Sequence, residues 1–358
     1  MPSGALRYLG ETIDWRSNLA TRSIPLLIRR LRQAGFGSEF VSAAMLPDWW
    51  DQSCLKQPEL LPEIEIRVGR FLAVPLSTVS DPETTLEPLG YPEARLRCVR
   101  DIGRDRLAPA IHAAMQIAGA VVRNLKEPVP APTAPPSDGL AWRQEIRGFD
   151  GSSVLDAIVE DLWTRGIPVV PAHLLPTPGF QGLAAVVEDR PVVVLGHRHD
   201  EPGRVAFRIS HEVGHIAKGH CTPDAPVVDE DEEILQDDEM EELADEYAVR
   251  ALVGEAAISL PSPSALGNFR DLATQAAAAA RETGVDAGSI IFSWVRTTGD
   301  YATATTATKA LYLATGATRI LRQYFRRFVD AEGASPSDQE LMRVIVPGPP
   351  PSADASSR

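Results

Sequence analysis

The chain has 358 residues, is 44% hydrophobic and carries a formal net charge of −14. This length and composition allow a real core and about two domains. We expect a soluble cytoplasmic protein, because no apolar run reaches the roughly 20 residues of a membrane helix and the N-terminus lacks a signal-peptide pattern. Three widely spaced cysteines give neither a disulfide framework nor a paired-cysteine metal site.

Helical patterns dominate the first part of the chain, and we predict a helical N-terminal domain over residues 1–126. Residues 64–79 faintly resemble the first part of a helix-turn-helix, but Pro75 and Pro82 leave little room for a recognition helix. A helical interaction or dimerisation module is an equally good interpretation. The predicted helices cover residues 24–34, 59–72 and 107–125.

Charge argues against strong direct DNA binding by either part of the chain. Residues 1–130 hold 16 basic and 15 acidic side chains, so the acidic excess lies in the remainder. A phosphate backbone would not be attracted to a neutral or an acidic surface. We therefore expect a protein partner rather than DNA.

Proline-rich stretches divide the rest of the chain. Residues 127–140 are predicted to form an extended linker and residues 347–358 a disordered tail. Between them, residues 141–260 mix helices with short strands, and residues 261–346 are helical. The fold class is therefore α+β and predominantly helical, with a small β-sheet. After residue 140, the predicted helices outside the motif region cover residues 154–165, 271–283, 289–296, 303–315, 319–330 and 337–346, and the predicted strands cover 167–171, 183–188 and 191–195, with a hairpin across Asp189-Arg190.

The segment His211-Glu212-Val213-Gly214-His215 carries the clearest chemical signal. Apolar residues at helical spacing run through it, with Asp200 as the expected N-cap and Pro202 in the first turn. Residues i and i+4 share a helix face, so His211 and His215 can bind one Zn²⁺. Glu212 lies about 100° round the helix, where it can act as a general base toward a water that the metal activates.

A catalytic zinc usually has three protein ligands, so a third is expected downstream. Apolar residues between 240 and 252 predict a second helix, on which Glu241 and Asp245 share a face. Glu241 could bind the metal while Asp245 holds the ring N–H of a ligand histidine. Glu242 is the main rival to Glu241. Small Ala244 would let the two helices approach closely.

The order of strand, HEVGH helix and Glu-x-x-Ala-Asp helix resembles the ImmA/IrrE metallopeptidases over about residues 145–255. The resemblance implies a zincin-like core with His211, His215 and Glu241 on zinc and Glu212 as base. It also implies a specific protein substrate, often a helix-turn-helix repressor. The chain departs from that family in two features: Val253-Gly254 replaces the usual Met-Pro, and the span between the helices is unusually acidic.

That acidic span, residues 229–246, holds twelve acids and no base. It can be a solvated loop and helix N-terminus, where acids suit the helix dipole. It can also be a patch that attracts a basic protein such as a DNA-binding repressor.

Other residues near the motif carry weaker signals. For His220 and Cys221 we expect capping or packing, because they follow His215 by five or more residues and would lie past the active face. Low-grade candidates for stabilising an oxyanion are Tyr301, His197 and His199.

The favoured hypothesis from the sequence is a cytoplasmic zinc endopeptidase. One alternative is a regulatory protein-binding or DNA-associated scaffold with a structural or sensing zinc site, and another is a hydrolase of small peptides or other amides. Glu212 favours an enzyme, since a scaffold has no need of an acid or base beside the metal.

Overall fold

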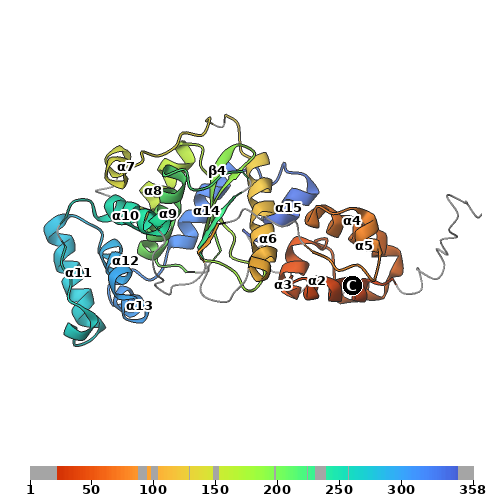
Figure 1. Ribbon diagram of the computed structural model, residues 1–358, viewed down its shortest axis with the longest axis horizontal. Coiled ribbons are helices and arrows are strands. Elements are labelled where there is room, and N and C mark those ends of the chain that lie inside the picture. The colour runs from red at the N-terminus through yellow and green to blue at the C-terminus, as the bar shows by residue number, and fades with distance from the viewer. Residues whose placement is uncertain are drawn as a thin grey trace, which may run out of the picture. The chain divides into compact units, whose positions relative to one another are not determined.

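The chain forms two compact units, Met1–Leu89 and Gly90–Arg358, in a computed structural model (Figure 1). The structure describes residues 22–87, 95–97, 104–128, 130–147, 153–196, 199–223, 225–229, 239–256 and 258–345. Within these ranges, no helix has the length and apolarity needed to cross a bilayer. The predicted tail at 347–358 lies outside the described residues.

The described residues of the first unit, 22–87, form helices and connecting turns. Three aromatic rings fill its core: Phe71 meets Phe36 and Phe40 edge-on, with ring centroids 5.6 and 5.7 Å away. Ala73, in the left-handed conformation, ends α4, and the following α5 has only five residues. The second helix of the helix-turn-helix-like stretch is therefore short, in keeping with its flanking prolines. The elements are α2 (Ile24–Gln33), α3 (Ser38–Ala44), η1 (Gln52–Lys56), η2 (Pro58–Leu60), α4 (Leu61–Leu72) and α5 (Leu76–Ser80).

A five-stranded mixed sheet lies in the second unit, with strand order β1-β5-β3-β4-β2 among the described residues. The β3–β4 hairpin turns at Glu188 and Asp189, whose φ angles of 50° and 62° suit a type I′ turn. This turn lies one residue before the predicted one. β1 and β5 are three-residue strands, too short to show a period in the sequence. The strands are β1 (Arg95–Arg97), β2 (Val169–Pro171), β3 (Gly182–Val187), β4 (Arg190–Leu195) and β5 (Val227–Asp229).

Helices cover both faces of this sheet. With these helices and one mixed sheet, the described part of the unit is α+β and predominantly helical. Both α6 and α9 contact β3 and β4, and they lie on opposite sides of the sheet (Figure 1). Alternation along β3 agrees, because Gly182 faces α9 while Val187 faces Gly119 of α6. The helices are α6 (Arg104–Arg123), α7 (Gly139–Glu145), α8 (Val154–Thr164), α9 (Pro202–Ala217), α10 (Glu239–Val253), η3 (Pro263–Ala265), α11 (Phe269–Thr283), α12 (Ala287–Thr298), α13 (Tyr301–Ala310), α14 (Ala317–Phe328) and α15 (Pro336–Met342).

The boundary between the two units lies at residues 89 and 90. The sequence analysis places the division later, at the proline-rich segment 127–140. The proline-rich segment is extended, belongs to the second unit and is hydrogen-bonded to other parts of that unit. Arg190 donates to the Pro130 carbonyl at 3.1 Å, and the Tyr247 hydroxyl donates to the Pro136 carbonyl at 3.1 Å. Proline lacks an N–H but keeps a good acceptor, so such a chain can be held by donors from elsewhere. Helix α6, which precedes it, belongs to the second unit.

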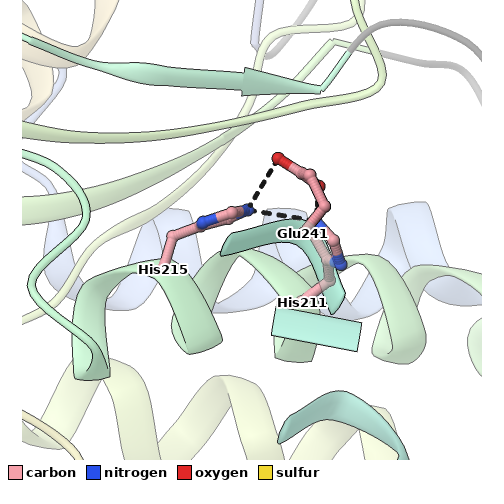
Figure 2. A group of neighbouring side chains, drawn as sticks. All are labelled: His211, His215 and Glu241. Carbon is pink, nitrogen blue, oxygen red and sulfur yellow. Dashed lines mark hydrogen bonds and ion pairs between the residues drawn. The ribbon is translucent and has the colours of Figure 1, made fainter. Parts of the chain in front are cut away.

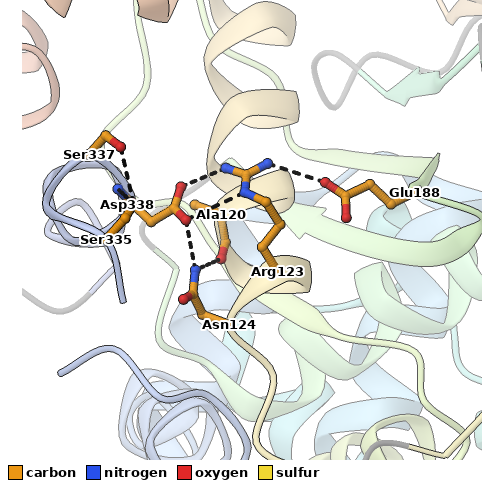
Figure 3. Close-up of polar contacts among 7 residues, drawn as sticks. All are labelled: Ala120, Arg123, Asn124, Glu188, Ser335, Ser337 and Asp338. Atoms are coloured by element: carbon orange, nitrogen blue, oxygen red, sulfur yellow. Dashed lines mark hydrogen bonds and ion pairs between the residues drawn. The ribbon is translucent and has the colours of Figure 1, made fainter. Parts of the chain in front are cut away.

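Arg123 at the end of α6 ties the last helix to the sheet (Figure 3). Its guanidinium donates to Asp338 of α15 at 2.6 Å and to Glu188 in the hairpin turn at 3.3 Å. Asn124 donates to the same Asp338 carboxylate at 2.9 Å. Burial alone would raise the pKa of Asp338, but these hydrogen bonds outweigh it and lower that pKa. The C-terminal helices are thus joined to the unit that holds the histidine motif.

Candidate metal centre

The histidine motif lies on α9, whose apolar face is fully buried as the sequence predicts. The N-cap is Glu201, not Asp200. The Asp200 carboxylate instead accepts from the backbone N–H groups of Gly316 and Thr318, at 3.0 and 2.7 Å. Asp200 therefore caps the start of α14. The local sequence around Asp200 could not predict this, because α14 begins more than 100 residues later.

His211, His215 and Glu241 point toward one another (Figure 2). Glu241 Oε2 lies 3.1 Å from His211 Nε2, and Glu241 Oε1 lies 3.4 Å from His215 Nε2. The two Nε2 atoms are 3.2 Å apart. All three side chains are buried, and their nearest ligand atoms lie within 4.8 Å of one another. This group could hold a metal ion.

Glu241 is distinguished from its acidic neighbours by burial. Its residue is 4% exposed, whereas Glu242 and Glu246 on the same helix are exposed. Among the described residues, it is Glu241 and not Glu242 that converges with the two histidines.

Small residues allow α9 and α10 to approach closely enough for this convergence. A Cβ added at Gly214 would lie 2.9 Å from Ala244 Cα and 3.2 Å from Tyr247 Cβ. Neither atom belongs to a flexible side-chain end, so a larger residue at 214 would push the helices apart. The close approach expected from Ala244 is confirmed, and it depends equally on Gly214.

Helix α7 packs against α10 and holds it in place. The sequence analysis placed the first two residues of α7 in the linker. Trp142 is fully buried and stacks on Tyr247 with ring centroids 5.8 Å apart. Arg143 donates to the carbonyls of Ala251 and Leu252 at the end of α10, at 3.0 and 2.7 Å. With Gly254 at φ 73°, these bonds end the helix without the Met-Pro pair.

Asp245 contacts the first histidine as predicted. Its Oδ1 lies 2.8 Å from His211 Nδ1, and its Oδ2 accepts from Arg296 Nε of α12 at 3.3 Å. An imidazole that binds a metal through Nε2 carries its proton on Nδ1, so Asp245 is placed to accept it. Arg296 was not found from the sequence, since it lies 51 residues away.

His220 contacts the second histidine, and this contact was missed. Gly219 has φ 69°, and the N–H groups of Gly219 and His220 donate to the carbonyls of Ile216 and His215. This is a Schellman ending, which folds the chain back onto the last helical turn. His220 Nδ1 therefore lies 3.0 Å from His215 Nδ1 instead of past the active face. The Lys218-Gly219 pair was the sequence signal for it.

Glu212 is fully buried and lies against β3. A Cβ added at Gly182 would overlap its carboxylate. Gly182 is therefore the position that leaves room for the Glu212 side chain beside the sheet. The sequence showed Glu212 but gave no reason to single out Gly182.

The charges of the site differ between the two histidines. Burial alone would lower the pKa of His211, but hydrogen bonds to Asp245 and Glu241 raise it to about 9. Burial lowers the pKa of His215 to about 4, and the charge of His211 adds to this effect. Burial alone would raise the pKa of Glu241, yet its hydrogen bonds from both rings hold it well below the ordinary range.

The weaker candidates are not brought to this group by any described contact. The guanidinium carbon of Arg204 lies over the Tyr301 ring, 5.1 Å from the centroid of that ring. His199 Nδ1 lies 3.8 Å from Glu201 Oε2. His197 and residues 230–238 of the acidic span lie outside the described residues.

No family model, curated protein or solved structure matches this chain.

Proposed function

We propose that the protein is a zinc-dependent endopeptidase that cleaves a specific intracellular protein. The observation that carries this proposal is the buried convergence of His211, His215 and Glu241 beside Glu212. Two imidazoles and one carboxylate supply three ligands and leave a fourth position for water or substrate, which is the arrangement of catalytic zinc sites. The donor set suits Zn²⁺ better than Mg²⁺ or Ca²⁺, which prefer oxygen ligands.

Bound Zn²⁺ would polarise the scissile carbonyl and lower the pKa of a water. Glu212 takes the proton of the attacking water and delivers it to the leaving amine nitrogen. Asp245 keeps the proton of His211 on Nδ1, so that Nε2 presents its lone pair to the metal. Gly182 gives the Glu212 carboxylate its place, since any side chain there would displace it.

The proposed substrate is a protein, and a helix-turn-helix repressor is the specific candidate. The resemblance to the ImmA/IrrE metallopeptidases supports this candidate, as does the acidic span, which would attract a basic DNA-binding protein. We expect the protein to act in the cytoplasm, where such repressors are found. Direct DNA binding by this chain is not part of the proposal.

A second candidate is a regulatory scaffold with a structural or sensing zinc site. Burial favours it, because His211, His215 and Glu212 are at most 1% exposed and a peptidase must admit its substrate. The presence of Glu212 favours the enzyme, since closed structural sites need no proton carrier.

The test combines metal analysis with a cleavage assay on wild type and Glu212→Gln. Each purified protein is assayed for zinc by mass spectrometry and incubated with a helix-turn-helix repressor encoded beside its gene. We expect both to bind one zinc and only the wild type to cut. Zinc in both without cleavage by either would select the scaffold. A wild-type protein that binds no zinc would overturn both candidates.

A further inference from the structure

A cavity lies close to the metal centre, between the C-terminal half of α10, the segment that follows it, and α12. Its volume is about 340 Å³, which is within the range of small-molecule sites. Val249 and Val253 of α10 face Ile290 and Trp294 of α12 across it. On α10, residues 241, 245, 249 and 253 follow one another at intervals of one turn. The cavity thus continues the helix face that carries Glu241 and Asp245.

The lining is part apolar and part polar. Ile258 and Leu260 add to its apolar side chains, and its polar groups come from Arg296, Ser259, Ser293 and Thr297. Ser293 Oγ is buried and has no hydrogen-bond partner within the described part of the chain. Arg296 is one-third exposed, and its one ion pair there is made through Nε to Asp245. Its two Nη groups leave donors for a planar acceptor, which a guanidinium binds best.

We propose that this cavity binds a small apolar carboxylate, with the hydrocarbon body between α10 and α12 and the carboxylate on Arg296. Apolar side chains, one cation and three hydroxyl groups together select that chemistry. A neutral hydrocarbon would leave the guanidinium and the hydroxyl groups unmatched, and a polyanion would meet a single cation in the lining.

The same arginine connects the cavity to the metal centre. Arg296 Nε donates to Asp245 Oδ2, and Asp245 Oδ1 contacts His211 Nδ1. A carboxylate on Arg296 would draw part of its positive charge away from Asp245, leaving Asp245 a stronger acceptor for the His211 N–H. Ligand and metal would then strengthen each other's binding, because such coupling is reciprocal. This coupling rests on the proposed metal site, whereas ligand binding itself does not.

The binding test uses octanoate as the probe and octan-1-ol as its neutral control, on full-length protein freed of metal with EDTA. Binding is followed by calorimetry and by tryptophan fluorescence, since Trp294 lines the cavity. We expect octanoate to bind at least tenfold more tightly than octan-1-ol. Equal binding of the two probes, or binding of neither, would overturn the proposal.

Variants test the location. Arg296→Gln should abolish the preference for octanoate, and Val249→Phe should fill the cavity and weaken both probes. The matched control is Arg281→Gln on α11, an exposed arginine outside the cavity lining, which should bind as wild type does. Circular dichroism and thermal melting confirm that each variant is folded. Octanoate binding that survives both Arg296→Gln and Val249→Phe in folded protein would contradict the site.

The coupling test measures zinc affinity by competition with a chromogenic chelator, with and without saturating octanoate. We expect octanoate to tighten zinc binding roughly two- to fivefold, the scale of a partly exposed ion pair, and to have no effect in Arg296→Gln. Octanoate binding without any zinc shift would reject the coupling and keep the ligand site. Cleavage activity enters none of these measurements, so a failed peptidase proposal would be seen separately.

Discussion

The two sides of the metal centre are built differently, although each presents one histidine. On the α12 side, His211 is held by the Asp245 carboxylate, which is in turn held by Arg296. On the other side, His215 contacts a second imidazole, His220, that a Schellman ending folds back. Burial lowers the pKa of His215 to about 4, whereas the hydrogen bonds of His211 to Asp245 and Glu241 outweigh burial and raise its pKa to about 9.

The protein therefore orients its two imidazoles through different partners, a carboxylate for His211 and an imidazole for His215. A carboxylate acceptor strengthens the N–H bond of its ring and raises that ring's basicity, whereas an imidazole mainly fixes orientation. We therefore expect the α12 side to determine metal affinity more strongly than the His220 side.

The largest effect is expected from Glu241→Gln, which removes the ligand shared by both sides. A neutral amide is a poorer zinc ligand than a carboxylate. Loss of a residue that only hydrogen-bonds a metal ligand costs up to roughly 100-fold in metal affinity, and loss of a ligand itself should cost more than that. Chelator competition measures it. Glu242→Gln is the matched control, because it makes the same chemical change one residue along on an exposed side chain. Equal losses in the two variants would show that Glu241 is not a ligand.

Asp245→Asn should have the next largest effect. The amide keeps the shape but loses the charge that accepts the His211 proton, so zinc affinity should fall about 10- to 100-fold. The measurement is again chelator competition, with zinc stoichiometry determined at saturation. A loss below threefold would remove the basis for ranking the α12 side first.

His220→Leu should weaken zinc binding by less than Asp245→Asn, roughly tenfold or less, because the partner it removes is an imidazole and not a carboxylate. Leucine is similar in size to histidine and fills the buried position, so thermal melting of the metal-free variant should stay close to wild type. Should its zinc affinity fall further than that of Asp245→Asn, the ranking of the two sides would be reversed.

The sequence predicted the parts of this site that follow helical periodicity. His211 and His215 recur one turn apart on one helix, and Glu241 and Asp245 recur one turn apart on another, so spacing alone placed each pair on a face. The structure then showed which acid turns inward, since Glu241 is buried and Glu242 is exposed.

What the sequence could not predict depends on contacts between distant segments. Arg296 reaches Asp245 across 51 residues, and the Asp200 carboxylate caps a helix more than 100 residues later. The fold class, most helices and three of the strands were predicted. The three-residue strands β1 and β5 and the docking of the proline-rich segment were not, because neither carries a periodic signal. The contact of His220 with His215 differs from these, because a local turn at Lys218-Gly219 produces it.

The smallest effect on the metal centre is expected from Arg296→Gln, which acts only through Asp245. The arginine is one-third exposed, and pairs of that kind contribute about 1 kcal/mol or less. Without the guanidinium, Asp245 is a stronger acceptor for the His211 N–H, so zinc affinity should rise by about fivefold at most. The decisive measurement is a double-mutant cycle. If Arg296 acts through Asp245, then adding Arg296→Gln to Asp245→Asn should cause no further change in zinc affinity. A gain in the double variant equal to that of the single variant would mean that Arg296 affects the metal centre by another route, and a loss in the single variant would contradict the proposed direction of the coupling.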